Sequence, residues 1–294
     1  MGRPRAVDLL LALRPRQWVK NVFVLAALVF SERLGDPAAI LRVGAAFAVF
    51  CVLSSAVYLI NDLRDRDADR LHPTKRLRPI AAGALSASTA STWAVLLAVG
   101  ALLCAFGLNA RFGNVAAAYL VLNLAYSFGM KRIVILDVMM VATGFLLRAL
   151  AGAVVIDVAI SRWLVMCTGL LALFLGFAKR RQEVVSMEGI AGTRQILKEY
   201  SLPFLDQVIA IVTGATVVAY SLYAFSPEVA QKLGTEHLGL TIPFVLFGIF
   251  RYLYLVHRKG AGENPTVVIL GDIPLIIDVL LWGAVVTVVL YVWR

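Results

Sequence analysis

Long blocks of apolar residues alternate with charged connections along most of the chain. The blocks are roughly 17–25 residues long, which is the length that a helix needs to cross about 30 Å of hydrocarbon. They lack the alternation of period two that membrane β-strands show, and helices satisfy their own backbone hydrogen bonds in lipid. The pattern predicts nine membrane-spanning helices, at about 18–32, 38–61, 87–108, 112–130, 134–156, 162–178, 204–224, 239–256 and 268–293.

The composition agrees with a membrane protein. Hydrophobic residues make up 61% of the 294 positions, whereas a soluble domain is nearer half apolar. The predicted fold class is therefore all-α, a polytopic membrane protein built as a bundle of nine helices. The sequence shows no convincing short repeat and no low-complexity tract, and we expect a single transmembrane domain over residues 1–294.

The 28 lysines and arginines are distributed unevenly between the two sides of this predicted bundle. Most lie in the N-terminal segment and in the connections after the second, fourth, sixth and eighth spans. The opposite side holds Arg33, Arg42, Arg111, Arg162, Lys232 and Arg294. Because cytoplasmic loops carry the excess of positive charge, we expect a cytoplasmic N-terminus. The membrane is expected to be a bacterial cytoplasmic membrane.

The charge distribution also indicates where function lies. The two long connections on the basic side, at about 62–86 and 179–203, are richly charged, so we expect an active site that faces the cytoplasm. The net charge of +10 is explained by topology and by attraction to anionic lipid. We therefore expect the lipid bilayer, and no nucleic acid, as a partner; a homo-oligomer is left open.

A carboxylate cluster stands at the end of the second predicted span, in the pattern Asn61-Asp62-x-x-Asp65-x-x-x-Asp69. At 100° per residue, Asp65 and Asp69 lie at about −60° and about −20° from Asp62 on a helix, while Asp67 lies at about 140°. Carboxylate oxygens at this density suit Mg²⁺, which takes one or two carboxylates together with phosphate oxygens. Asn61 either adds a neutral oxygen or holds an aspartate in place. The alternative is a solvated helix end balanced by neighbouring arginines.

A basic stretch follows directly, with Lys75, Arg76 and Arg78 in four positions. Lysine and arginine recognise phosphate oxygens by charge, and arginine also does so with two parallel hydrogen bonds. Acids that hold a metal beside bases that hold oxygens are what a metal–diphosphate complex requires. The alternative is an anchor to the lipid surface.

Other polar residues lie at the same predicted depth. Lys20 and Asn21 stand just inside the edge of the first span. Tyr126 and Lys131 lie at the turn between the fourth and fifth spans, and Asp137 follows about one turn into the fifth. Each of these side chains is a candidate to reach the same site.

Arg148 lies about three turns deeper than Asp137 and is the one cation well inside a predicted span. A buried arginine needs a partner, so it either pairs with Asp137 or another acid or lines a polar cavity. After the sixth span, Lys179, Arg180 and Glu183 return to the basic face.

The motif Asn61-Asp62-x-x-Asp65-x-x-x-Asp69 and the nine-span layout resemble the UbiA superfamily of intramembrane prenyltransferases. The resemblance covers nearly the whole chain. It implies that Asp62, Asp65 and Asp69, with Asn61, bind Mg²⁺ and a diphosphate donor inside a helical bundle. Aromatic prenyltransferases of that superfamily carry a second motif, Asp-x-x-x-Asp, after the sixth span. Residues 179–188 of this chain contain no aspartate.

One branch of the superfamily is more similar. The runs at 14–21 and 72–83 and the pattern Tyr126-Ser127-x-x-x-Lys131 resemble the decaprenyl-phosphate phosphoribosyltransferases. This resemblance implies a glycosyltransferase that moves 5-phosphoribosyl from 5-phosphoribosyl 1-diphosphate (PRPP) to a polyprenyl phosphate of the decaprenyl type. Diphosphate is released, and the product serves the synthesis of arabinose donors for cell-wall glycans.

The expected roles follow from three anionic groups that such an enzyme must hold. Mg²⁺ and the cations Lys75, Arg76 and Arg78 neutralise the departing diphosphate. The candidates for the 5-phosphate and the acceptor phosphate are Lys20, Lys131, Lys179 and Arg180. Asp137 either binds a ribose hydroxyl or orients Lys131.

Two other functions are considered. The first is a UbiA-type prenyltransferase that moves a prenyl group from prenyl diphosphate to an aromatic or other acceptor, and it is disfavoured by the missing second motif. The second is a transporter, which predicts acids near mid-membrane on broken helices. The acids here gather at one face beside phosphate-type cations, which favours an enzyme.

Overall fold

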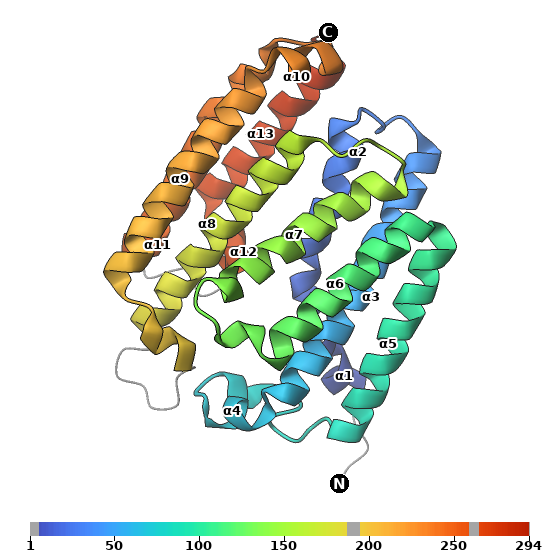
Figure 1. Cartoon of the computed structure of the whole chain (residues 1–294), viewed down its shortest axis with the longest axis vertical. Coiled ribbons are helices and arrows are strands. Elements are labelled where there is room, and N and C mark those ends of the chain that lie inside the picture. Colours follow the sequence, from blue (N-terminus) through green and yellow to red (C-terminus); the bar gives the residue numbers. More distant parts are fainter. Residues whose placement is uncertain (1–5, 187–194, 259–264, 294) are drawn as a thin grey trace. The chain divides into compact units, whose positions relative to one another are not determined.

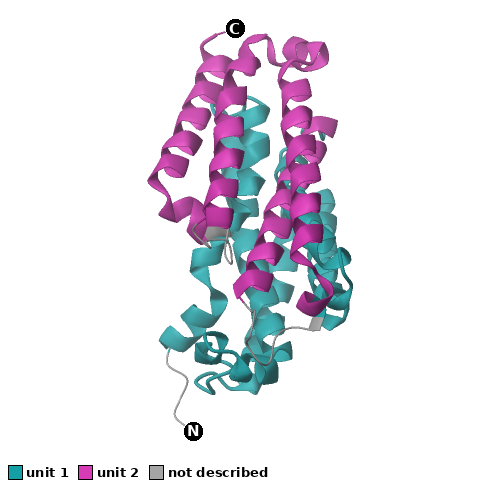
Figure 2. Ribbon diagram, turned by 90° about the vertical axis from the view of Figure 1, so that its left-hand side faces the viewer, with its two compact units in different colours: residues 1–160, 190–196 teal, residues 161–189, 197–294 magenta. Residues whose placement is uncertain are grey.

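The computed structural model describes residues 6–186, 195–258 and 265–293, and all regular structure in these ranges is helical (Figure 1). The chain divides into two compact units (Figure 2). Unit 1 comprises residues 1–160 and 190–196, and unit 2 comprises residues 161–189 and 197–294. The single transmembrane domain expected over residues 1–294 stays a prediction.

Unit 1 contains the helices from the N-terminus to α7. They are α1 (Ala6–Leu13), the 3₁₀ helix η1 (Pro15–Leu25), α2 (Ala26–Phe30), α3 (Pro37–Arg64), α4 (Arg66–Leu71), η2 (Lys75–Leu77), α5 (Ala87–Leu108), α6 (Ala110–Phe128), η3 (Met130–Arg132) and α7 (Leu136–Val155). Polar side chains start three of the long helices: Asp36 caps α3, Ser86 caps α5 and Asn109 caps α6. These caps satisfy amide groups that the first helical turn leaves without partners.

Unit 2 contains the remaining long helices. They are α8 (Arg162–Ser186), α9 (Leu202–Ala224), α10 (Pro227–Leu233), η5 (His237–Thr241), α11 (Ile242–Arg258), α12 (Pro265–Gly271) and α13 (Ile273–Tyr291). The short 3₁₀ helix η4 (Gln195–Glu199) precedes α9. α8 packs along α9, and α11 packs along α13.

Within the described ranges, seven helices are long and apolar enough to cross a membrane, and the prediction of nine is wrong by this measure. The seven are Pro37–Arg64, Ala87–Leu108, Leu136–Val155, Arg162–Ser186, Leu202–Ala224, His237–Arg258 and Ile273–Tyr291. α6 has the length for a span, but Arg111, Asn114 and Asn123 lower its apolar content. The first predicted span is not one continuous α-helix.

The first predicted span instead forms η1 and the short helix α2. Arg14 precedes η1 with a left-handed backbone (φ 54°, ψ 59°), and Pro15 is its first residue. η1 packs against α3 and α7. Its Asn21 is fully buried and donates from Nδ2 to Ser54 Oγ (3.4 Å) and to Cys51 Sγ (3.3 Å). Asn21 and Val24 are the buried residues of η1, whereas Val19 and Val22 are 40% and 48% exposed.

Two other predicted boundaries move. α8 continues to Ser186, so residues 179–186 are helical and do not form the loop expected at about 179–203; residues 187–194 of that loop lie outside the described ranges. The last predicted span is divided at Asp272 into α12 and α13. Pro274 lacks an amide proton, and Asp272 Oδ1 accepts from the Leu275 amide (3.1 Å), so a new helix starts there.

Small residues let the helices of unit 1 approach closely. α5 buries Ala90, Ala94, Ala98, Ala101 and Ala105, which recur at intervals of three or four positions on one face. This face packs on α3. Close backbone approach through small residues is a general means of packing helices in membranes, where apolar side chains gain little by leaving lipid.

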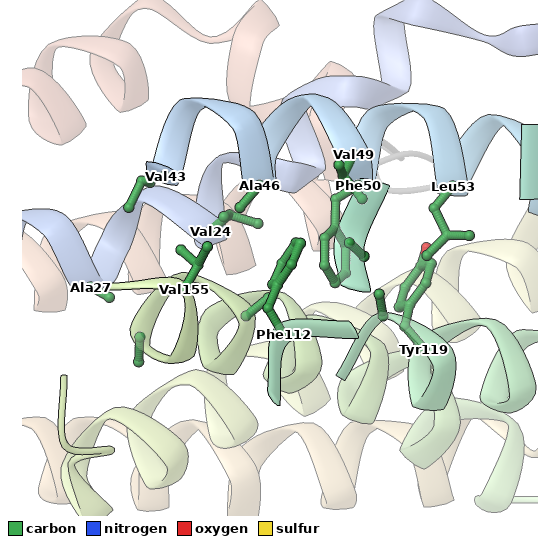
Figure 3. Packing of buried hydrophobic residues seen from close by; sticks show 14 of the residues in the cluster. Val24, Ala27, Val43, Ala46, Val49, Phe50, Leu53, Phe112, Tyr119 and Val155 are labelled. Atoms are coloured by element: carbon green, nitrogen blue, oxygen red, sulfur yellow. The ribbon is translucent and has the colours of Figure 1, made fainter. Parts of the chain in front are cut away.

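An aromatic group fills the space between α3 and α6 (Figure 3). The Phe50 ring lies 5.2 Å from the Tyr119 ring and 6.0 Å from the Phe112 ring, measured between centroids. All three side chains are at most 2% exposed. Val24 and Val155 belong to the same core, so η1 and α7 are packed into it.

Gly152 marks the closest approach of η1 to α7. A Cβ atom at this position would collide with the carbonyl oxygen of Val24, which is a backbone atom and cannot turn aside. By contrast, a Cβ atom at Gly100 in α5 would meet nothing within 4 Å.

We predict that Gly152→Ala lowers the free energy of unfolding of unit 1 by about 1–3 kcal/mol, the usual cost of overpacking. The matched variant Gly100→Ala should be neutral or stabilising, because alanine favours a helix over glycine by about 1 kcal/mol. Melting temperatures of the purified proteins in one detergent compare the two. Equal melting temperatures would contradict the close approach.

Candidate active site

The carboxylates of the sequence motif lie where α3 ends and α4 begins. Asp65 terminates α3 and precedes α4, yet the backbone bonds from Asp65 N to Asn61 O (2.9 Å) and from Asp69 N to Asp65 O (2.8 Å) continue the helical pattern through it. The side chains therefore keep nearly the angular order of one helix. Asp62 and Asp69 are 3% and 5% exposed.

Two arginines bind Asp62 from different parts of the chain. Arg14 Nη2 donates to Asp62 Oδ1 (2.5 Å) and Oδ2 (2.7 Å). Arg78 Nη1 donates to the same Oδ1 (3.1 Å) and also to Asp69 Oδ2 (2.6 Å). Asp62 and Asp69 thus face one shared guanidinium, as two residues on one side of a helix must.

The third carboxylate and the asparagine of the motif contact the end of α6 and the turn after it. Lys131, in η3, forms an ion pair with Asp65. Ser127 Oγ, near the end of α6, donates to Asn61 Oδ1 (3.2 Å). Residues about 66 positions apart in sequence therefore meet at this point.

Asp67 points away from this group, as helix geometry predicts. Its side chain is 78% exposed and pairs with Arg66 and Arg70, both at 3.3 Å. In the basic stretch, Arg78 turns back to the carboxylates, Lys75 is half-buried and Arg76 is exposed. The three cations thus differ in their surroundings although they are almost adjacent in sequence.

The carboxylate and amide oxygens of the motif fit a hard divalent cation that also takes ligands from a substrate. Among the described residues, no group of three or more carboxylate, histidine or cysteine side chains is arranged to hold a metal ion by itself. Mg²⁺ needs only one or two carboxylates when phosphate oxygens complete its coordination. Asp62 and Asp69 supply such a pair, because one nitrogen atom of Arg78 contacts both.

The intramembrane cation Arg148 is bound by neutral groups. Its side chain, 6% exposed, donates to Asn21 Oδ1 (2.8 Å), Gly144 O (2.9 Å) and Tyr119 Oη (2.7 Å). It also lies over the rings of Tyr119 (4.8 Å) and Phe145 (5.1 Å). None of these partners is a carboxylate, so the contacts favour a role in holding η1, α6 and α7 together.

The other predicted residues of unit 1 lie on the elements that carry this cluster. Lys20 is half-buried on η1, and Tyr126 is half-buried near the end of α6. Asp137, in the first turn of α7, is fully buried. All three have polar or ring contacts.

Unit 2 contains the remaining predicted residues, on the last turns of α8. Arg180 is 4% exposed and forms an ion pair with Glu183, which Lys179 also approaches at 3.6 Å. Gln182 beside them is 3% exposed, and its Oε1 atom has no hydrogen-bond partner among the described residues. This helix end therefore presents three cations, counting Arg181, with one acid among them.

Some ion pairs of the structure include residues that were not predicted for the site. Arg14 contacts Asp62, and the sequence signal for it was its position in the basic run before the first span. In unit 2, Arg181 Nε donates to Asp206 Oδ1 (2.5 Å), which His257 Nε2 also approaches (3.4 Å). No pattern in the sequence connects these three residues, which come from α8, α9 and α11.

These features define a class of protein. It is an all-helical membrane protein that carries carboxylates and phosphate-type cations at the end of a membrane helix. The family model described as the UbiA prenyltransferase family matches residues 21–269. The chain therefore belongs to the UbiA prenyltransferase family, as the sequence motif predicts.

Curated relatives are similar over nearly the whole chain. A decaprenyl-phosphate phosphoribosyltransferase from Mycolicibacterium smegmatis is 39% identical over 297 residues, which cover 96% of this chain and 92% of the relative. A protein of the same name from Corynebacterium glutamicum is 36% identical over 287 residues, covering 96% of this chain and 86% of the relative.

Solved structures share the fold at low identity. A UbiA homologue from Archaeoglobus fulgidus, bound to DMAPP and Mg²⁺, superimposes with a TM-score of 0.74 at 18% identity. The match covers 97% of this chain and 99% of the homologue. At this identity the likeness shows the fold alone.

We predict that Tyr119→Phe destabilises unit 1 by about 1–3 kcal/mol, because it leaves a buried N–H group of Arg148 without an acceptor while keeping the ring. Tyr252→Phe is the matched control: Tyr252 is also 2% exposed, but its hydroxyl has no partner among the described residues. That variant should be neutral or stabilising. Thermal unfolding in detergent measures both, and equal effects would contradict the bond to Arg148.

Proposed function

We propose that this protein is a polyprenyl-phosphate phosphoribosyltransferase. It transfers 5-phosphoribosyl from PRPP to a polyprenyl phosphate of the decaprenyl type and releases diphosphate, in the synthesis of arabinose donors for the cell wall. The observation that carries this proposal is the 39% identity, over nearly the full length of both chains, to a decaprenyl-phosphate phosphoribosyltransferase.

The number of cations among the predicted site residues supports a substrate pair rich in phosphate. Unit 1 supplies Arg14, Arg78 and Lys131 beside its carboxylates. α8 of unit 2 supplies Lys179 and Arg180 where other family members carry a second acidic motif. A donor with a diphosphate and a 5-phosphate, together with an acceptor phosphate, needs more cations than a prenyl diphosphate alone.

Asp62, Asp65 and Asp69 are the residues that would hold Mg²⁺, with Asn61 as a neutral oxygen ligand. When bound, the metal ion withdraws charge from the donor diphosphate and so improves it as a leaving group. Ser127 fixes the Asn61 amide by a hydrogen bond, which orients its oxygen. A solved UbiA homologue contains Mg²⁺, and this supports the same ion here.

The basic stretch serves the departing diphosphate. Lys75, Arg76 and Arg78 neutralise the charge that grows on its oxygens as the bond to the ribose breaks. The oxygen of the acceptor phosphate attacks the anomeric carbon from the opposite side. Because that phosphate is already an anion at neutral pH, the protein needs no strong general base, and positioning carries the rate.

The remaining site residues are assigned to the other polar groups of the substrates. Lys20, Lys131, Lys179 and Arg180 are proposed to bind the 5-phosphate and the acceptor phosphate. Asp137 binds a ribose hydroxyl or orients Lys131. The other residues proposed to bind the substrates are Asn21, Tyr126, Arg148 and Glu183.

The proposed location is a bacterial cytoplasmic membrane, with the N-terminus and the active site on the cytoplasmic side. The seven apolar helices and the family support an integral membrane protein. The orientation is the one that the sequence predicts from the positive charges counted over nine spans. PRPP is a soluble, charged donor, so a cytoplasmic site gives it direct access.

We predict that Asp65→Asn lowers the rate of phosphoribosyl transfer by roughly 100-fold or more, because it removes a charge that faces the metal and its substrate. Asp67→Asn removes the same charge two positions away, on the exposed side, and should change the rate by no more than about twofold. Transfer of radiolabelled ribose phosphate to lipid measures both. Full activity of Asp65→Asn in folded protein would refute the metal assignment.

A donor assay tests the proposed reaction against prenyl transfer. The purified protein with Mg²⁺ and a polyprenyl phosphate should release diphosphate from PRPP and form a lipid heavier by one phosphoribosyl group. With a prenyl diphosphate and an aromatic acid, neither diphosphate release nor a prenylated product is expected. The mass of the lipid product identifies the donor, and a prenylated aromatic acid would favour the alternative function.

A further inference from the structure

Arginine side chains already bind three oxygen atoms of the carboxylate cluster: both oxygens of Asp62 and one of Asp69. Both oxygens of Asp62 accept hydrogen bonds from Arg14 Nη2, at 2.5 and 2.7 Å. Arg78 Nη1 adds a third bond to Asp62 and binds Asp69 at 2.6 Å. Each carboxylate oxygen has two lone pairs, and Asp62 Oδ1 already accepts two hydrogen bonds, one from each arginine. A divalent cation would therefore compete with the guanidinium groups for these oxygens.

The balance of charge also opposes a metal ion that arrives alone. Each of the three carboxylates is matched by at least one cation: Arg14 and Arg78 at Asp62, Arg78 at Asp69, and Lys131 at Asp65. Because Asp62 and Asp69 are almost fully buried, an added double positive charge would be weakly screened by water. A metal ion that enters with a diphosphate brings negative charge with it.

The two arginine side chains are more exposed to solvent than the carboxylates that they bind. The side chains of Arg14 and Arg78 are 25% and 27% exposed, whereas those of Asp62 and Asp69 are 4% and 7% exposed. Arg14 lies at the junction of α1 and η1, and Arg78 lies in the connection between η2 and α5. Guanidinium groups bind phosphate oxygens as well as carboxylates, so they have a second partner when a diphosphate is present.

We propose that Arg14 and Arg78 hold the carboxylates in the substrate-free protein and turn to phosphate oxygens when a metal–diphosphate complex binds. This partner exchange makes metal binding depend on the diphosphate. The inference rests on the proposed function for the use of a diphosphate donor. It goes further by adding Arg14 to the site and by assigning both arginines a role in the order of binding.

The exchange predicts a measurable coupling between the two ligands. A diphosphate should tighten metal binding strongly in the native protein, because it gives the arginines their second partner. Replacing either arginine by glutamine should free carboxylate oxygens and tighten the binding of metal alone. Arg78 spans two carboxylates, so Arg78→Gln should have the larger effect.

Equilibrium dialysis of the full-length protein in detergent against Mn²⁺, with and without inorganic diphosphate, tests this coupling. We expect Arg78→Gln to bind Mn²⁺ alone about tenfold more tightly than the native protein, which is an ordinary size for a coupling between sites. The tightening caused by diphosphate should shrink by at least the same factor. Arg14→Gln should change both quantities in the same direction.

Arg66→Gln is the matched control, because it removes one positive charge close by from a side chain that pairs with the exposed Asp67. It should leave Mn²⁺ binding close to that of the native protein. If neither Arg78→Gln nor Arg14→Gln binds Mn²⁺ more tightly than Arg66→Gln, the arginines are structural ion pairs and the proposal is refuted. Where melting curves show one variant to be unfolded, the other decides.

The probe keeps this test separate from the proposed function. Inorganic diphosphate carries no ribose, so an error in the donor sugar leaves the coupling intact and affects only the transfer assay. Conversely, normal phosphoribosyl transfer without coupling between Mn²⁺ and diphosphate would refute the partner exchange and leave the proposed reaction standing.

Discussion

The carboxylates at the end of α3 must be neutralised within the protein, because a buried charge without a partner is costly. Asp62 is 3% exposed and receives two guanidinium groups. Meeting this requirement fixes several segments that are otherwise short and irregular. Arg14 anchors the junction of α1 and η1, Arg78 brings back the connection that follows η2, and Lys131 anchors the turn between α6 and α7. The ion pairs of the candidate site therefore also hold these segments in place at this end of unit 1.

Arg148 shows how the same unit treats a charge at greater depth. Here the cation is bound by an amide oxygen, a backbone carbonyl and a phenol, with two aromatic rings beside it. The amide belongs to Asn21 on η1, so the unusual 3₁₀ backbone of that segment is secured by a side chain from α7. The close approach at Gly152 brings the two elements together. In unit 1, the cations near the end of α3 thus bind carboxylates. Arg148, which lies deeper, binds neutral groups and joins helices.

The absence of the second acidic motif changes the chemistry that α8 provides. Glu183 is the acid that remains beside Lys179 and Arg180, and it neutralises the buried Arg180. The Lys179 side chain is 41% exposed and only approaches Glu183. A helix end of this kind is suited to binding an anion and poorly suited to holding a second metal ion. This agrees with a transfer in which a phosphate is the acceptor.

The sequence by itself determined the class of protein, most of the helices and the helix face that Asp62 and Asp69 share. These features depend on residues close together in the chain: apolar runs of sufficient length, caps such as Ser86 and Asn109, and the 100° repeat that separates Asp67 from Asp62. Only the tertiary structure decided which cation meets which acid, because Arg14 lies 48 positions from Asp62 and Lys131 lies 66 positions from Asp65. It also decided the 3₁₀ form of the first membrane segment, since hydropathy records how apolar a segment is and not how its backbone is bonded. Pairing across such separations depends on how helices pack, which no local pattern contains.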